Sequence, residues 1–372
     1  MNIVLPGGAG FIGTHLYKKL LKNNEKITII DSLTSNIHEK KFLELPESLE
    51  LLKCDYADLN QCGQIYLNAD VIVLLAAETG MGASQFNNEL YFDCNTLKTA
   101  KLIDFLRENN SKAHIIVTSS CRIYGEGLYK CLEHGSFYPS NRIEEIKNSN
   151  WHVTCPICKK ESKFIANKNN QFFKPVSTYA ISKLAQEMTC LVNSTSSELD
   201  VTVLRLQNVY GPGQSFQNAY TGLISIFTQR LLNNNSIELY EEGSPGRDFV
   251  YVEDVADAII NCIYSRENSS EKTFDIGSGK ILTIENVAVV LSEIIKSKQE
   301  ILKTKKFRVG DIHIGCADII EAKNSLNWTP KVSFKDGIRN YVNWIKKQEN
   351  ILDRSIEVSK ELSNKGILNE IK

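Results

Sequence analysis

A short apolar segment that runs straight into a glycine-spaced turn constrains the fold of this chain more than any other feature. Residues 1–5 are the candidate strand, and Gly7, Gly10 and Gly13 follow at the spacing G-x-x-G-x-x-G before an amphipathic helix. Glycines at this spacing allow a tight turn and let the backbone approach a pyrophosphate, while a helix that starts near Phe11 directs its free N–H groups at the phosphates. The sequence therefore predicts a dinucleotide site at the first strand-to-helix turn.

An acidic residue at the end of the second apolar segment indicates which dinucleotide is bound. Asp31 lies 18 residues after Gly13 and directly follows the candidate strand 26–30. A carboxylate at this place accepts hydrogen bonds from the adenosine ribose and repels a 2′-phosphate. We therefore predict NAD, rather than NADP, as the cofactor.

The balance of charge and the lengths of the apolar runs narrow the class of partner. The 372 residues predict about two domains, and the 43 basic and 44 acidic side chains nearly cancel, which argues against a nucleic-acid partner. The longest apolar run, residues 71–77, is too short to cross a bilayer, so no membrane partner is expected. We read no signal peptide, and ten cysteines then indicate reduced thiols in the cytoplasm. A small molecule is the expected partner.

The rhythm of apolar segments predicts an α/β fold with a doubly wound parallel sheet and a second, smaller C-terminal domain. Strands are expected at residues 3–5, 27–30, 49–52, 71–75, 114–118 and 201–206, with helices between them. We predict a dinucleotide-binding domain at residues 1–206, interrupted by an insertion at 126–172, and a substrate domain at 207–346 with helices at 220–232 and 284–296. Residues 249–273 are a candidate return to the first domain, and residues 347–372 are expected to form a helix or tail.

A Tyr-x-x-x-Lys pair supplies the candidate acid–base group. Tyr179 and Lys183 occur in a segment of strong helical propensity, and a spacing of four places them on one helix face. An ammonium group beside a phenol lowers the pKa of the phenol toward the range of a general base. Ser120 ends the apolar segment IIVTSS at the carboxyl edge of the predicted sheet, where its hydroxyl can bond a sugar oxygen.

An ordered series of motifs, GGAGFIG, CDYAD, LLAAE, SSCRIYG, YAISK, LRLQNVYGP and RDFVYVEDVA, resembles the extended short-chain dehydrogenase/reductase family of nucleotide-sugar epimerases and dehydratases. The resemblance spans residues 1–345. It implies a Rossmann domain that holds NAD tightly, a nucleotide-sugar substrate, a catalytic set of Ser120, Tyr179 and Lys183, and a homodimer through paired helices.

The same resemblance assigns the remaining site residues. The expected cofactor contacts are Gly7, Gly10, Phe11, Ile12, Gly13, Asp31, Asn36, Asp55, Tyr56, Leu75, Ala76, Ala77, Asn95, Tyr179 and Lys183. Besides Ser120, the expected substrate contacts are Asn208, Asn218, Arg247 and Arg308, and two arginines suit one pyrophosphate because the guanidinium fork pairs with phosphate oxygens. Two alternatives stay open at this point: Asn95 as a helix cap and Arg308 as a surface ion-pair partner.

The residues after Ser120 bear on the reaction. Cys121 and Arg122 stand where the resembling 4,6-dehydratases carry an acid, and elimination loses its proton donor without that acid. The 3,5-epimerases carry a cysteine at the position of Arg122, so Cys121 is one place too early for that chemistry. What remains is 4-epimerisation, in which Tyr179 takes the proton of the 4-hydroxyl as hydride passes to the nicotinamide, and hydride then returns to the opposite face of the rotated 4-keto sugar.

The substrate has a preferred assignment and rivals. The segments LAAETGMG, YGEGLYKC and NAYTGLISIF are most similar to the dTDP-L-rhamnose 4-epimerase group, which makes dTDP-6-deoxy-L-talose, although that group typically has Arg where Cys121 stands. UDP-hexose 4-epimerisation and 4,6-dehydration are the enzymatic alternatives. A catalytically idle NAD-binding scaffold or redox sensor is the alternative outside enzymes.

Two cysteine-containing pairs inside the insertion predict a structural zinc site. Cys131-x-x-His134 and Cys155-x-x-Cys158 are separated by 20 residues, a spacing that resembles a zinc ribbon with four ligands and no open coordination position. His152 is an alternative fourth ligand in place of His134. The other interpretation is plain thiols in an extended flap over the active site.

Overall fold

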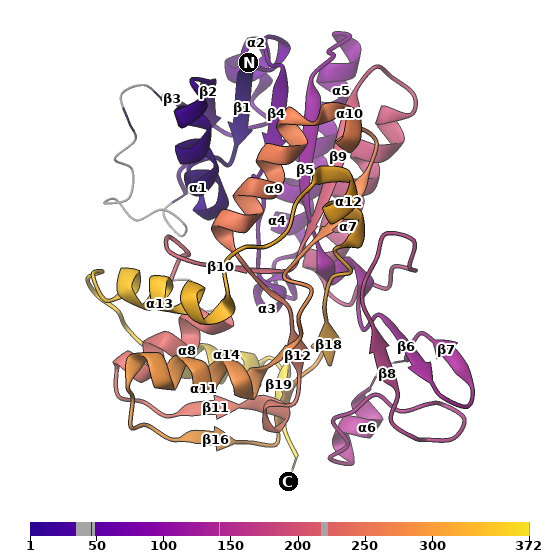
Figure 1. Cartoon of the computed structure of the whole chain (residues 1–372), viewed down its shortest axis with the longest axis vertical. Coiled ribbons are helices and arrows are strands. Elements are labelled where there is room, and N and C mark those ends of the chain that lie inside the picture. The colour runs from indigo at the N-terminus through magenta and orange to yellow at the C-terminus, as the bar shows by residue number, and fades with distance from the viewer. Residues whose placement is uncertain (35–45, 47–48, 141, 217–221, 372) are drawn as a thin grey trace.

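The computed structural model describes residues 1–34, 46, 49–140, 142–216 and 222–371, and its centre is a seven-stranded parallel sheet (Figure 1). The strand order is β14-β9-β5-β4-β1-β2-β3. The strands are β1 (Asn2–Pro6), β2 (Lys26–Ile30), β3 (Glu50–Leu52), β4 (Val71–Leu74), β5 (His114–Ser120), β9 (Asp200–Leu206) and β14 (Thr273–Ile276). The predicted doubly wound parallel sheet is therefore confirmed.

Helices cover both faces of this sheet, because its strands are apolar on both sides. One face packs against α1 (Phe11–Leu20), α9 (Val252–Tyr264) and α12 (Ile320–Leu326), and the other against α2 (Leu59–Leu67), α5 (Lys98–Glu108) and α7 (Thr178–Ser194). In β1, Ile3 and Leu5 face the first of these layers and Val4 faces the second. The carboxyl ends of β1, β4 and β5 thereby share one edge, where the candidate site residues follow the strands.

A second hydrophobic core lies below the carboxyl edge of the sheet in the view of Figure 1. It is built from α8 (Leu223–Leu232), α11 (Ile284–Ile295) and α13 (Phe334–Ile345) together with short strands. Paired strands in this half are β10 (Asn208–Tyr210) with β13 (Phe249–Tyr251), β11 (Ile237–Leu239) with β16 (Ile301–Lys303), β12 (Gly246–Arg247) with β15 (Leu282–Thr283) and β18 (Ile314–Gly315), and β17 (Lys306–Arg308) with β19 (Leu368–Glu370).

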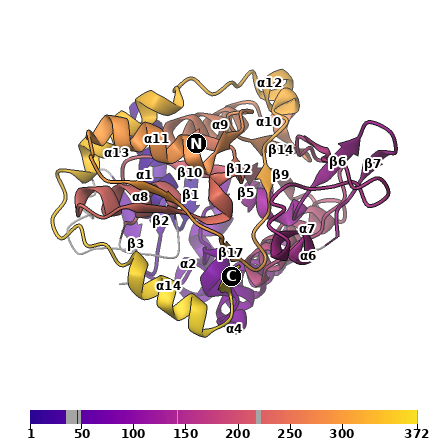
Figure 2. The ribbon, with the colours of Figure 1, turned by 90° about the horizontal axis from the view of Figure 1, so that it is seen from below.

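The insertion forms a small antiparallel sheet at one side of the molecule, where Figure 2 shows it projecting from the rest of the chain. Its strand order is β7-β6-β8, with β6 (Leu128–Cys131), β7 (Gly135–Phe137) and β8 (Lys163–Ile165), and the short helix α6 (Ile143–Lys147) follows β7.

Short helices complete the chain at the loops and at the C-terminus. They are α3 (Met81–Ser84), α4 (Asn88–Phe92), α10 (Arg266–Ser269), α14 (Ser355–Asn364), the 3-10 turns Leu21–Asn23, Cys121–Tyr124 and Tyr240–Gly243, and the π-helical turn Asp93–Leu97. None of the helices in the described part of the chain is long and apolar enough to span a membrane.

The structure agrees with the six expected strands within two residues and adds further strands, of which two change the predicted organisation of the chain. Strand β14 pairs in parallel with β9 and so brings the chain after α9 back to the large sheet. Strand β19 pairs antiparallel with β17, so the segment expected as a helix or tail is a helix followed by a strand. The helix expected at 220–232 is described from Leu223, and the helix at 284–296 ends at Ile295. The proposed domain limits at 206 and 346 stay predictions.

Candidate active site

The glycine turn after β1 is shaped by close backbone contacts. Gly7 has a φ of +76°, and a Cβ atom there would lie 2.4 Å from the backbone nitrogen of Ala76. A Cβ atom on Gly13 would lie 2.3 Å from the carbonyl oxygen of Gly8. Helix α1 begins at Phe11 after Gly10, which has no side chain to cap the helix, so the first-turn N–H groups of Phe11 and Ile12 precede the helical ladder and are suited to phosphate oxygens.

Asp31 is tied to this turn. Its side chain is 7% exposed, one carboxylate oxygen accepts the N–H of Ala9 at 3.2 Å, and the other accepts the N–H of Leu33 at 2.9 Å. These bonds fix the carboxylate beside the glycine turn, at the carboxyl end of β2, as a ribose contact requires.

The segment after β4 closes the other side of the turn and is fastened by Asn95. Leu75 and Ala76 donate their N–H groups to the carbonyl of Pro6, and Ala77 follows them half-buried. Asn95 is fully buried and bonds both the N–H and the C=O of Glu78, at 2.8 and 3.0 Å. Asn95 also donates to the Ser182 hydroxyl at 3.0 Å, within α7. It lies inside the π-helical turn, and its side chain joins the loop after β4 to α7.

Asp55 and Tyr56, two of the predicted cofactor contacts, differ from each other in exposure. Tyr56 is 5% exposed and its hydroxyl donates to the carbonyl of Cys94 at 2.6 Å, so its ring belongs to the core. Asp55 is partly exposed and pairs with Lys98 at 2.8 Å. Of these two side chains, that of Asp55 is the one accessible to a ligand. Asn36 and Asn218, also expected at the site, lie outside the described residues.

The three candidate catalytic residues come from β5 and α7. Ser120 is the last residue of β5, and its hydroxyl accepts the N–H of Arg122 at 3.2 Å and bonds to the Tyr179 hydroxyl. Helix α7 begins after Ser177, whose hydroxyl caps it by accepting the N–H of Ala180. Tyr179 and Lys183 lie one turn apart on α7, as the spacing predicts, and the Lys183 ammonium donates to the Gln186 side chain. The structure thus brings Ser120 and Tyr179 together at the sheet edge.

Burial shifts the pKa values of Tyr179 and Lys183. Burial raises the pKa of Tyr179 above its usual value, while its hydrogen bond with Ser120 and the nearby charge of Arg122 oppose that rise. Burial lowers the pKa of Lys183 to about 8. The direction for Tyr179 is opposite to the one expected from the helix spacing, because desolvation of the phenolate outweighs the neighbouring hydrogen bond and charge.

Two of the expected substrate residues, Asn208 and Arg247, lie near Arg122, which is two residues after Ser120. Asn208, in β10, accepts from Arg122 at 2.9 Å and donates to the carbonyl of Asp248 at 2.8 Å. The second guanidinium nitrogen of Arg122 is buried with no hydrogen-bond partner among the described residues. Arg247, in β12, is 8% exposed, and burial together with the positive charge of Arg122 lowers its pKa to about 10. Two neighbouring cations make this an attractive place for an anionic ligand.

Arg308 is further along the substrate half, in β17. Its guanidinium lies 5.2 Å from the centre of the Tyr240 ring, and its Nε is buried without a hydrogen-bond acceptor in the described part of the chain. A stacked cation with an unused donor suits phosphate binding better than the alternative of a surface ion pair.

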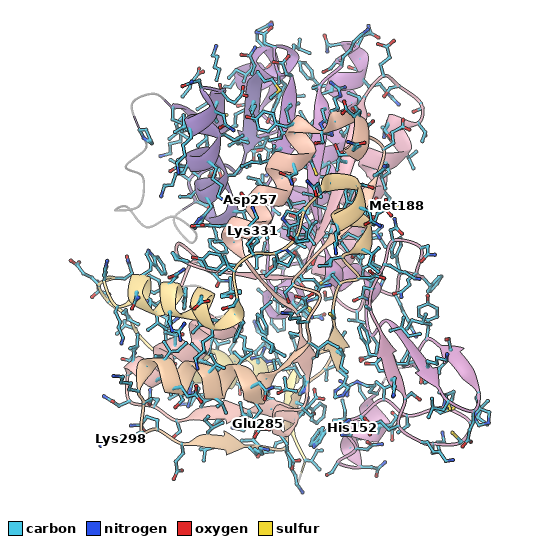
Figure 3. All side chains as sticks on the ribbon, in the orientation of Figure 1. His152, Met188, Asp257, Glu285, Lys298 and Lys331 are labelled. Atoms are coloured by element: carbon cyan, nitrogen blue, oxygen red, sulfur yellow. The ribbon has the colours of Figure 1, made fainter. Side chains whose placement is uncertain are left out.

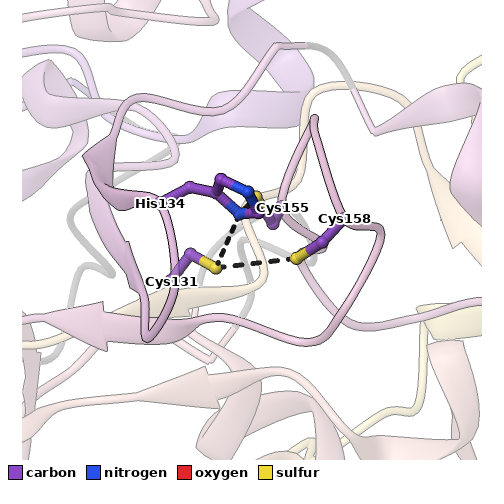
Figure 4. A group of neighbouring side chains, drawn as sticks. All are labelled: Cys131, His134, Cys155 and Cys158. Atoms are coloured by element: carbon purple, nitrogen blue, oxygen red, sulfur yellow. Dashed lines mark hydrogen bonds between the residues drawn. The ribbon is translucent and has the colours of Figure 1, made fainter.

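The four predicted metal ligands converge in the insertion (Figure 4). Their donor atoms lie within 4.8 Å of one another. The Cys131 sulfur is 3.6 Å from His134 Nδ1 and 3.7 Å from the Cys158 sulfur, and the Cys155 sulfur is 3.6 Å from His134 Nδ1. Tetrahedral zinc with ordinary Zn–S and Zn–N lengths has ligand separations of about 3.6–3.8 Å. The donor set therefore fits zinc.

The backbone around Cys131 favours a thiolate at this residue. Backbone N–H groups of Glu133 and His134 lower the pKa of Cys131 to about 6. His152, the alternative ligand, instead pairs with Glu161 at 3.3 Å and is not one of the four converging residues.

The comparisons with known proteins agree with the fold and the motifs. Residues 3–148 and 153–277 match the NAD dependent epimerase/dehydratase family. The chain belongs to this family. It is 32% identical to a dTDP-L-rhamnose 4-epimerase of Burkholderia thailandensis, over 95% of this chain and 96% of the relative.

Further relatives carry different sugars in their names. A UDP-glucuronate 4-epimerase of Thermodesulfobacterium geofontis is 26% identical over 95% of this chain and 99% of its own length. The crystal structure of a Thermotoga maritima UDP-glucose 4-epimerase with UDP-glucose superposes with a TM-score of 0.77 at 26% identity, covering 93% of this chain and 99% of that one. The prediction that this chain is an NAD-dependent enzyme of the epimerase class is confirmed at the level of the family.

Some residues at the site escaped the sequence analysis. Gln186, fully buried on α7, bonds both Lys183 and Thr99 and so holds the lysine in place. Its spacing of three from Lys183 was a usable signal on a predicted helix. Arg142 lies in the insertion, and no spacing rule connects it with the carboxylates that it contacts.

Proposed function

We propose that this protein is a nucleotide-sugar 4-epimerase that interconverts dTDP-L-rhamnose and dTDP-6-deoxy-L-talose. The observation that carries the proposal is that Ser120, at the carboxyl end of β5, and Tyr179, near the start of α7, are close enough to interact, with Cys121 and Arg122 following Ser120 in place of an acid. The name of the relative that is 32% identical supports the choice of sugar.

The chain's own residues divide the work between binding and proton transfer. The glycine turn and Asp31 would hold NAD, which when bound supplies reversible oxidation at carbon 4 of the sugar. Tyr179 exchanges a proton with the 4-hydroxyl, and Ser120 bonds the same oxygen and the phenol. The cationic form of Lys183 favours the phenolate. Arg247 and Arg308 would bind the diphosphate, which leaves the hexose beside Ser120.

A UDP-hexose is the second candidate substrate. The named UDP-sugar 4-epimerases among the relatives and solved structures favour it, and these span almost the same length as this chain. The nucleotide base and the substituent at carbon 6 distinguish the two candidates.

Incubation of the NAD-loaded protein with a panel of dTDP- and UDP-sugars, followed by NMR of the products, tests both. We expect a 4-epimer of a dTDP-6-deoxy-L-hexose in the wild-type protein and none in Tyr179→Phe, which should keep its NAD. Ser120→Ala should lose less activity, roughly 1.5–3 kcal/mol in the barrier, because it removes one hydrogen bond. Accumulation of a 4-keto-6-deoxy sugar from dTDP-glucose would return the dehydratase to first place.

A structural zinc ion is a second proposal, supported by the donor set and separations of Cys131, His134, Cys155 and Cys158. Four protein ligands leave no open position for chemistry, so the ion would fold the insertion. Metal analysis of protein purified under reducing, chelator-free conditions should find about one zinc per chain. Finding almost none would overturn the proposal.

We also propose a homodimer, in which α7 packs against a second copy of the chain. Ile181, Met188 and Val192 are 43%, 42% and 60% exposed and fall on one face of α7, and Figure 3 places Met188 at the outer edge of the molecule. Light scattering should give twice the chain mass, and Met188→Lys with Val192→Lys should give a monomer. A cytoplasmic location is proposed as well, supported by ten cysteines that form no disulfide.

A further inference from the structure

The insertion lies between the two segments that carry the candidate catalytic residues. The insertion begins at Glu126, six residues after Ser120, and it ends a few residues before α7, which carries Tyr179. After the insertion, Lys174 donates its N–H to the carbonyl of Ile123 at 3.0 Å. The segment that follows the insertion is therefore bonded to the segment that precedes it. The insertion is therefore anchored at the catalytic loop.

Arg142 joins this anchor to the substrate half. Its side chain is 5% exposed, and its Nε pairs with Glu126 at 3.1 Å while a terminal nitrogen pairs with Glu241 at 3.2 Å. The other terminal nitrogen also donates to Glu241, at 3.3 Å, and the guanidinium donates to the main-chain carbonyls of Trp151 at 2.9 Å and Asp311 at 3.5 Å. One guanidinium thus contacts Glu126 at the end of the segment 121–126 that follows Ser120 (the Ser120 loop), the insertion at Trp151, and the substrate half at Glu241 and Asp311.

The contacts of the insertion continue along residues 311–318. Glu126 accepts the N–H of His313 at 2.7 Å through its second carboxylate oxygen. At the far end, Asn167 donates its N–H to the carbonyl of Cys316 at 2.8 Å and accepts the N–H of Asp318 at 2.7 Å. The His152 ring, labelled at the base of the insertion in Figure 3, lies 5.4 Å from that of His313. The segment is held by the insertion at both ends.

Residues 311–318 in turn hold Arg247. Strand β18 in this segment pairs in parallel with β12, so that Arg247 lies opposite Gly315. The Arg247 guanidinium donates to the carbonyl of Ile312 at 2.7 Å and to that of His313 at 2.9 Å. The segment after Ser120 is therefore joined to Arg247 through Glu126 and His313, and Arg142 holds Glu126 against Glu241 and the carbonyl of Asp311.

We propose that Arg142 is a positioning residue for the nucleotide sugar, which fixes Arg247 relative to the Ser120 loop by joining Glu126 to Glu241 and to the main chain at Asp311. This rests on the proposed binding of the diphosphate by Arg247. A buried guanidinium with several acceptors orients all of them at once, because its donors are set in a rigid plane that a lysine does not have. Glu241 is held with a φ of +47°, an uncommon conformation for a non-glycine residue that the surrounding contacts must maintain.

The test compares Arg142→Met, Arg142→Lys and the control Lys147→Met in the full chain, loaded with NAD and zinc. Lys147 is an exposed cation of the same insertion that pairs only with Glu144 on α6 among the described residues. For the sugar that the wild type turns over, we expect Arg142→Met to raise KM at least tenfold with less than a threefold change in kcat. Arg142→Lys should be intermediate, and Lys147→Met should match the wild type. Affinity for dTDP and UDP, measured by calorimetry, should fall in parallel with KM.

Hydrogen exchange separates this inference from the proposed function. Arg142→Met should speed amide exchange in residues 246–248 and 311–317 and leave the distant helix α2 unchanged, whether or not any nucleotide sugar is turned over. A wild-type protein that is inactive on the whole panel of sugars contradicts the proposed function. The positioning role is overturned if Arg142→Met speeds amide exchange only within the insertion, or if the folded variant keeps the wild-type KM. If Arg142→Met does not fold, Glu241→Gln and Arg142→Lys replace it in the test. The positioning role of Arg142 is overturned if both variants keep the wild-type KM and the wild-type rates of amide exchange in residues 246–248 and 311–317.

Discussion

The glycine turn after β1 and the insertion at 126–172 both connect regular elements beside the candidate active site, yet different forces shape them. In the turn, Gly7 and Gly13 are required because the backbone leaves no room for a Cβ atom. In the insertion, side chains define the structure, through four convergent Cys and His side chains and the buried guanidinium of Arg142. The turn is therefore shaped by backbone contacts, within the turn at Gly13 and with the segment after β4 at Gly7, whereas the insertion depends on contacts between side chains.

The largest expected effect breaks the turn. Gly7→Ala forces a left-handed residue at φ +76° and places a Cβ atom 2.4 Å from the backbone of Ala76. The strain alone costs about 1–2 kcal/mol, and the overlap must also displace the segment after β4. We expect the purified variant to lose NAD, measured by release of nucleotide on denaturation, while its zinc content stays at the wild-type level. A variant that retains full NAD would show that the turn tolerates displacement.

Removing a metal ligand tests the other region by itself. Cys155→Ser should lose the zinc and lower the melting temperature, because metal binding and folding of the insertion are coupled. NAD content should not change. Cys54→Ser, a cysteine outside the cluster, is the matched control and should keep its zinc. If Cys155→Ser lost NAD and zinc to the same extent, the glycine turn and the insertion would not be independent of each other.

The pH dependence examines α7, which follows the insertion and carries both Tyr179 and Lys183. Because burial lowers the pKa of Lys183 to about 8, its positive charge is present below that pH and is lost as the pH rises through it. We expect kcat/KM to fall above pH about 8, by at most tenfold per pH unit, as the support for the phenolate disappears. A pH profile that stays flat to pH 10 would assign the proton transfer to groups other than this pair.

The smallest expected effect comes from a matched glycine in the insertion. Gly135 has a φ of +78°, close to that of Gly7, but a Cβ atom there meets nothing within 4 Å. Gly135→Ala should cost only the strain of the left-handed conformation, about 1–2 kcal/mol, in chemical denaturation. NAD and zinc should both stay bound. If Gly135→Ala lowered the free energy of unfolding as much as Gly7→Ala does, then the left-handed conformation, rather than contact with Ala76, would explain why Gly7 is required.

Particular residues show why part of the site could be predicted and part could not. Ser120 and Tyr179 were placed correctly at a strand end and on a helix because apolar runs and helical spacing are local signals. The rise in the pKa of Tyr179 was missed, since desolvation depends on what covers the ring. A return of residues 249–273 to the first domain was a candidate, but strand β14 itself was missed, because its four residues acquire their role only by pairing with β9.

The sequence by itself determined the parallel sheet and the glycine turn and indicated the candidate catalytic residues and the Cys and His pairs of the insertion, because each strand, turn and residue pair is a local pattern in the chain. The tertiary structure decided which distant groups meet: Asn95 with α7, Asn208 with Arg122, and Arg142 with Glu126 and Glu241. These partners are 16 to 99 residues apart. A side chain's hydrogen bonds follow from distance in space, and over such separations only the packing of the sheet, the substrate half and the insertion sets that distance.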